Sequence, residues 1–147
     1  MRNVANLINL STPLGLLLAA LGRGKLSLDG GLVIAEGVRL PLINASAMTV
    51  GCVVLIPGRS LEEAKALIPD LMHHEEQHAW QYAYCLGLPF LPLYGAAALW
   101  SMVRSGDRAS ANHFERQAGL ATGGYPQRPL VPVREGIRNL VGRRVRR

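Results

Sequence analysis

The stretch AMTVGCVVLIPGRSLEE, residues 47–63, marks the point where the β pattern of this chain gives way to helices. Residues 47–58 are rich in β-branched and apolar side chains and end at Pro57-Gly58, which predicts a strand followed by a turn. The next residues, SLEE, form a capping box with Ser60 as the N-cap and Glu63 three positions later. The stretch therefore predicts a strand that leads directly into a helix.

The segment before this stretch is also typical of β structure. KLSL and LVIA, residues 25–28 and 32–35, flank a DGG sequence, and this arrangement predicts a β-hairpin with an Asp-Gly turn. Pro41 limits the following residues to a sheet edge or to irregular structure. Residues 24–58 as a whole therefore predict a small antiparallel sheet.

The segment after the stretch is typical of helices. Three are expected: one from about Asp70 to Leu86, closed by Gly87, one over Leu91–Val103, and a short one that begins near Asn112. The order predicts an α+β fold, with a small N-terminal antiparallel sheet followed by a helical bundle. We expect one domain over residues 1–127 and a basic, arginine-rich tail over residues 128–147.

The net charge of +6 lies entirely in this tail. Residues 128–147 hold seven arginines and a single acid, Glu135, so residues 1–127 are balanced. Such a segment is typically a solvated terminus. Anionic membrane headgroups are the next candidate partner for its C-terminal arginines. Nucleic acid is disfavoured as a partner, because the tail has no interleaved aromatic residues and no known binding module.

The compartment is predicted from the N-terminus and the cysteines. Residues 1–24 contain an apolar run but no small-x-small cleavage site, so they predict an amphipathic or buried helix, with a membrane-surface anchor as the alternative. The cysteines, Cys52 and Cys85, do not form a disulfide framework. No long apolar segment lacks proline. We therefore expect a cytoplasmic protein, with peripheral membrane association as an alternative.

The sequence HEEQH, residues 74–78, carries the chemistry of the predicted helix 70–86. Positions i and i+4 lie on one helix face, so His74 and His78 can bind one Zn²⁺ ion together. The carboxylate of Glu75 points to the side of that face, where it can act as a general base on a water molecule. His73 and Glu76 lie off this face, and we expect them to be surface residues or supporting contacts.

A histidine pair of this kind needs a third ligand. NHFERQAG, residues 112–119, places Glu115 three residues before Ala118. HEEQH together with this segment resembles the gluzincin family of zinc metallopeptidases, in which H-E-x-x-H is completed by a glutamate in E-x-x-A/D on a later helix. The resemblance implies that His74, His78 and Glu115 are zinc ligands and that Glu75 is the catalytic base.

Two alternatives for the third ligand remain open. Asn112 and Glu115 also fit a capping box, in which the glutamate would only cap its helix. His113 is a rival ligand that points away from Glu115 on a helix. Beyond these, Tyr125 in ATGGYPQ is a candidate for stabilising an oxyanion, and its alternative role is packing beside a Gly-Gly turn.

A broader likeness covers the segment from the zinc helix to the glutamate. The chain resembles a group of short bacterial H-E-x-x-H proteins with a β-rich lead before the motif, and this predicts Thr49–Ile56 as an edge strand beside the cleft. The main functional prediction is a minimal zinc metallopeptidase acting on a peptide or protein substrate. The alternative is a non-catalytic zinc-binding domain. A carboxylate-bridged iron protein is disfavoured, because no second E-x-x-H is present.

Overall fold

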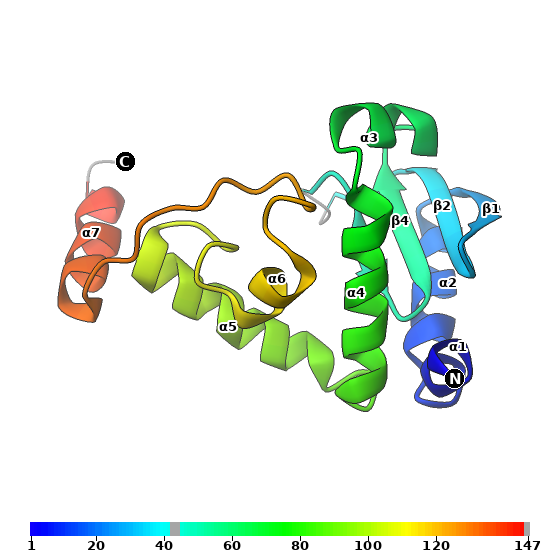
Figure 1. Ribbon diagram of the computed structural model, residues 1–147, viewed down its shortest axis with the longest axis horizontal. Coiled ribbons are helices and arrows are strands. Elements are labelled where there is room, and N and C mark those ends of the chain that lie inside the picture. Colours follow the sequence, from blue (N-terminus) through cyan, green and yellow to red (C-terminus); the bar gives the residue numbers. More distant parts are fainter. Residues whose placement is uncertain (42–44, 146–147) are drawn as a thin grey trace. The chain divides into compact units, whose positions relative to one another are not determined.

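The computed structural model describes residues 1–41 and 45–145 (Figure 1). The chain divides into two compact units, Met1–Phe90 and Leu91–Arg147, which are described separately. The elements of the first unit are α1 (Arg2–Ile8), α2 (Ser11–Leu21), β1 (Lys25–Asp29), β2 (Leu32–Val38), β3 (Met48–Val50), β4 (Val53–Pro57), α3 (Leu61–Leu67) and α4 (Leu71–Tyr84). The second unit holds α5, which starts at the boundary (Phe90–Ser105), α6 (His113–Ala118) and α7 (Val133–Val145). The fold class is α+β, as expected.

The four strands form one sheet in the order β1-β2-β4-β3. The predicted hairpin is present: β1 and β2 pair antiparallel, and Asp29 lies opposite Leu32 across Gly30 and Gly31. Both glycines have positive φ, 56° and 76°, as a two-residue hairpin turn requires. The expectation of a purely antiparallel sheet was wrong, because β2 pairs parallel with β4. For two strands to pair in parallel, the chain must return after β2 to the end of the sheet at which β2 begins. No local sequence pattern predicts this return.

The expected single strand Thr49–Ile56 is in fact a hairpin of two strands. β3 and β4 pair antiparallel, and the chain turns between them at Gly51, whose φ is +63°. A Cβ at Gly51 would lie 2.3 Å from the backbone nitrogen of Thr12, so a glycine is required there. β3 is one of the two edge strands, while β4 is buried in the interior of the sheet.

Helices cover both faces of the sheet, with α4 and α2 on opposite sides (Figure 1). Residues of β2 and β4 form the core with α3 and α4 on one face: Leu32, Ile34, Val54, Ile56, Ala64, Leu71 and Ala79. On the other face α2 sits directly on the strands, since a Cβ at Gly15 would lie 2.8 Å from the Cβ of Val53. This double cover explains why β4 is a continuous apolar run.

The helices of the first unit follow the predicted signals. Ser60 and Glu63 form the capping box of α3, and α4 begins two residues after Pro69. α4 ends at Tyr84, two residues earlier than expected, and Leu86 takes the left-handed conformation with φ of +59°. The N–H of Gly87 donates to the carbonyl of Tyr82 at 2.7 Å and closes the helix. The N-terminal segment, however, forms two helices bent by 77° rather than one. Among the described residues, no single helix is long and apolar enough to cross a membrane.

One expectation about α4 was wrong. From its sequence, the helix over residues 70–86 is expected to bury Leu71, Trp80, Tyr84 and Leu86, but Tyr84 and Leu86 are 73% and 78% exposed. Tyr82 takes that role: it is 1% exposed and its ring packs 4.5 Å from the ring of Phe90. Because burial removes water from the Tyr82 hydroxyl, the pKa of this phenol is raised above its ordinary value.

In the second unit, the basic segment 128–147 contains α7. The start of this helix packs on the end of α5, since the backbone of Gly136 closely approaches the carbonyl of Val103. The connection before α7 is fixed as well, because the N–H of Val131 donates to the carbonyl of Arg104 at 2.7 Å. Arg134 and Arg138 on α7 are exposed to solvent.

Candidate metal centre

His74 and His78 lie one turn apart on α4, as their spacing predicts. Their Nε2 atoms are 3.1 Å apart, and the two rings meet at nearly a right angle, 88°. Two zinc–nitrogen bonds of about 2.0–2.1 Å at a tetrahedral angle place two nitrogens about 3.3 Å apart. The observed spacing therefore fits two ligands of one ion. Both side chains are buried, at 1% and 8% exposure.

The ring of His78 is oriented by Gln81. The Nδ1 atom of His78 lies 2.8 Å from Oε1 of Gln81, and a carboxamide oxygen can only accept a hydrogen bond. Nδ1 therefore carries the proton, and the lone pair of Nε2 faces His74. A hydrogen bond to the distal ring nitrogen is the usual way in which proteins fix the tautomer of a metal-binding histidine.

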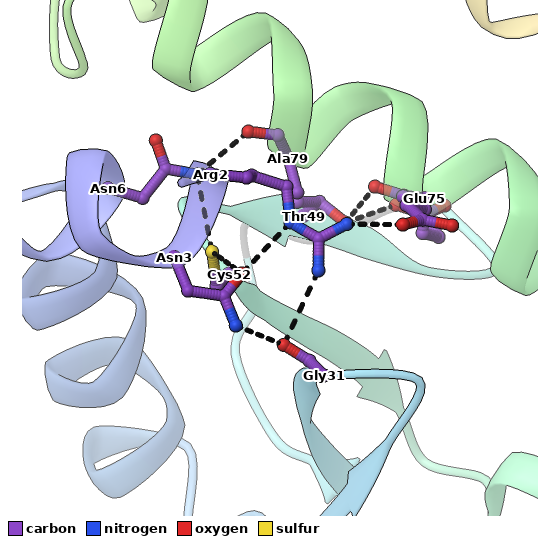
Figure 2. A network of polar contacts seen from close by, with 9 residues as sticks. Arg2, Asn3, Asn6, Gly31, Thr49, Cys52, Glu75 and Ala79 are labelled. Carbon is purple, nitrogen blue, oxygen red and sulfur yellow. Dashed lines mark hydrogen bonds and ion pairs between the residues drawn. The ribbon is translucent and has the colours of Figure 1, made fainter.

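The carboxylate of Glu75 is held by the edge strand. The hydroxyl of Thr49 on β3 donates to Oε2 of Glu75 at 2.6 Å, and both residues are buried (Figure 2). The hydroxyl of Thr49 therefore contacts Oε2 of Glu75 and not Oε1. The sequence did not single out Thr49, because the contact depends on how β3 packs against α4.

The opposite side of α4 is fixed by α1. Arg2 forms an ion pair with Glu76 at 2.5 Å, and its guanidinium lies 5.7 Å from the centre of the Trp80 ring. Asn6, which is fully buried, donates to the carbonyl of Ala79 at 2.7 Å (Figure 2). Glu76 is therefore a supporting contact that pairs with the basic side chain of Arg2, in line with the expectation for it. His73 is exposed, as expected.

Glu115 lies in the second unit, in the first turn of α6. It is 2% exposed, and the hydroxyl of Tyr94 on α5 donates to its Oε1 atom. Asn112 is the N-cap of α6, because its side chain accepts from the N–H of Phe114 at 3.0 Å. In a capping box, the carboxylate of Glu115 would accept from the N–H of Asn112. Here that N–H donates instead to the carbonyl of Ala109. Capping therefore does not account for the carboxylate of Glu115.

The other candidates in the second unit have different environments. His113, the rival ligand, is exposed at the start of α6. Tyr125 is half-buried in the segment after α6, where its backbone N–H donates to the carbonyl of Leu120 at 2.8 Å. Sequence reasoning missed the contact of Tyr94 with Glu115, and only the packing of α5 on α6 makes it visible.

Comparison of the chain with models of protein families, with curated proteins and with solved structures found no match.

Proposed function

We propose that this protein is a zinc-dependent hydrolase, and more specifically a minimal metallopeptidase. The proposal is supported chiefly by the buried pair His74 and His78, whose Nε2 atoms are 3.1 Å apart. Glu75, the residue after His74 in the motif, adds a buried carboxylate that can serve as the base. If these histidines were only polar residues on a helix surface, His74, Glu75 and His78 would not all be buried, because each buried polar group needs a partner.

The two histidines would hold the ion, and Glu75 would move the proton. A zinc ion at this position would lower the pKa of a water molecule and polarise the carbonyl of a substrate. Glu75 accepts the proton from the attacking water and then delivers it to the leaving amine, which is general base and general acid catalysis. Thr49 holds Oε2 of Glu75, so that Oε1 is the oxygen available for this transfer.

We propose Glu115 as the third ligand. Its carboxylate is buried at the start of α6, while the rival His113 is exposed. The Tyr94 hydroxyl supports one oxygen of Glu115, as the partners of ligating carboxylates usually do. Tyr125, which follows α6 in the same unit, is the candidate for stabilising the oxyanion of the tetrahedral intermediate.

The metal content of the purified full-length chain tests the metal centre. We expect about one zinc ion per chain in the wild type and almost none in His78→Ala, because the helix then offers a single imidazole. His73→Ala is the matched control, since His73 is an exposed histidine on the same helix. Equal zinc content in His73→Ala and His78→Ala would exclude this centre.

Catalysis is tested by Glu75→Gln with a library of fluorogenic peptides. The substitution keeps the shape of the side chain and its contact with Thr49, so zinc should remain bound while hydrolysis is lost. If the wild type holds zinc and no peptide or ester in the library is cleaved, the non-catalytic zinc-binding domain becomes the better description.

We further propose that the protein works in a reducing compartment such as the cytoplasm. Both cysteines are free thiols, with Cys52 buried. The C-terminal arginines are a candidate contact with anionic lipid headgroups. Deletion of residues 143–147 would then weaken flotation with vesicles that contain phosphatidylglycerol.

A further inference from the structure

The two N-terminal helices bury small and polar side chains. On α2 the buried residues are Ser11, Gly15 and Ala19, which repeat every four positions along one face. On α1 they are Arg2 and Asn6, also four positions apart. A Cβ at Gly15 would lie 2.4 Å from the carbonyl oxygen of Val50, so α2 approaches the sheet at backbone distance. Close approach through small residues is the usual packing mode of helices in membranes.

Most of the large apolar side chains of the same helices point the other way, while Leu14 and Leu18 are half-buried. The exposed residues are Val4, Leu7 and Ile8 on α1, Leu10 at the corner, and Leu16, Leu17 and Leu21 on α2. Ile8 is 75% exposed and Leu17 is 55% exposed. We call these seven residues the N-terminal apolar face. In a helix of a water-soluble domain, the apolar side faces the core and the polar side faces water, so this arrangement is inverted.

The charges around the N-terminal apolar face point to its occupant. Residues 3–22 carry no charged side chain, and residues 1–28 contain no acid. Arg2 is turned inward to Glu76. At the end of α2 lie exposed Arg23 and exposed Arg39, since the N–H of Arg39 donates to the carbonyl of Gly22. An apolar face with a cationic rim complements a bilayer surface with anionic headgroups.

We propose that the N-terminal apolar face docks this protein on the surface of an anionic lipid bilayer. A second copy of the same face is a poorer occupant, because the face has no acid to meet the arginines. The helices lie in the interface and do not span it. They are bent by 77°, and the contacts of Arg2 and Asn6 hold the inner side of α1 against α4. The seven apolar side chains enter the headgroup region while Arg23 and Arg39 meet the phosphates.

Vesicle flotation of the full-length protein tests this docking. The vesicles contain phosphatidylcholine either alone or mixed with phosphatidylglycerol, and the variant is Ile8→Gln combined with Leu17→Gln. The wild type should float with the mixed vesicles. The double variant should bind the mixed vesicles at least about tenfold more weakly, because each substitution removes the transfer free energy of a large apolar side chain.

Leu67→Gln is the matched control, because Leu67 is 63% exposed on α3, outside the face. It should float like the wild type. The proposal is overturned if the wild type does not float, or if the double variant floats equally well. It is also overturned if the wild type is dimeric in buffer without vesicles and the double variant is monomeric, which would make the face a contact between copies. Light scattering after size exclusion measures that state, and circular dichroism checks that each variant is folded.

Discussion

The Nδ1 atom of His78 lies 2.8 Å from Oε1 of Gln81, one turn further along α4. This hydrogen bond fixes the tautomer of the ring and directs the Nε2 lone pair toward His74, 3.1 Å away. The side chain that orients this histidine therefore belongs to the same helix as the histidine itself. A single helix thus carries the two proposed ligands, the contact that orients one of them and the proposed base.

Substitution of Gln81 should weaken zinc binding without removing a ligand. In Gln81→Ala the ring of His78 can rotate and change tautomer, so we expect the affinity to fall about 10–100-fold. Competition with a chromophoric chelator measures this change. Gln81→Glu should retain affinity close to that of the wild type, because a carboxylate still accepts from Nδ1. An affinity unchanged in Gln81→Ala would show that the hydrogen bond has no part in metal binding.

Thr49 should affect turnover more than zinc binding. In Thr49→Val the side chain keeps its volume but no longer donates to Oε2 of Glu75, so the carboxylate loses a fixed orientation. On any peptide that the wild type cleaves, we expect kcat to fall about tenfold while the zinc content stays the same. Thr49→Ser is the rescue variant, since it restores the hydroxyl. A Thr49→Val variant with normal kcat would remove Thr49 from the mechanism.

The third ligand is decided by a pair of substitutions on α6. Glu115→Ala should lower zinc affinity by several orders of magnitude, while His113→Ala should leave it unchanged, because His113 is exposed. Tyr94→Phe removes the hydroxyl that donates to Glu115 and should cause a smaller loss, about 10–100-fold. Titration with a zinc chelator ranks the three variants. The opposite order for the first two would make His113 the ligand.

Asn6 should contribute to the stability of the first unit. Asn6→Ala removes the hydrogen bond from its side-chain amide to the carbonyl of Ala79 and leaves a gap between α1 and α4. We expect a loss of about 1–3 kcal/mol in the free energy of unfolding, measured with urea. Asn3→Ala is the control: Asn3 is exposed, and its hydrogen bond to the carbonyl of Gly31 is open to water. Equal losses in both variants would show that burial of Asn6 is not the cause.

Asp107 should make the stability of the second unit depend on acid pH. Burial opposes ionisation of Asp107, but hydrogen bonds from Ser110 and Ala109 and the charge of Arg128 outweigh it, so its pKa is lowered below 3.8. Because the folded state prefers the charged form, this stabilisation is complete above the unfolded pKa and is lost as the pH falls through the folded pKa. Urea unfolding at a series of pH values should therefore show a shallower acid slope for Asp107→Asn than for the wild type. Identical slopes would contradict the assignment.

Local patterns predicted much of the helical part of the fold. The Ser60 capping box, the stop at Gly87 and the spacing of His74 and His78 each depend on residues within five positions of one another. The same is true of the hairpin turn at Gly30 and Gly31. These caps, turns and spacings depend only on residues close together in the sequence. The period of the helix or strand then fixes which side chains share a face.

The burial of aromatic residues on α4 was predicted less well. The periodicity placed aromatic side chains near the core, but Tyr82 is inward and Tyr84 outward. Tyr82 is buried because Phe90 folds back against it after the turn at Gly87. That choice depends on where the chain goes after the helix, and a helical wheel does not contain this information.

By itself, the sequence determined the helix proposed to bind zinc, with its two histidines and its glutamate on it, because these depend on the period of one helix. The tertiary structure decided the parallel pairing of β2 with β4, the turn at Gly51, and the contacts of Thr49 with Glu75 and Arg2 with Glu76. Each of these joins segments far apart in the chain. Their free energy comes from burial and hydrogen bonds that exist only after the sheet and helices have packed together.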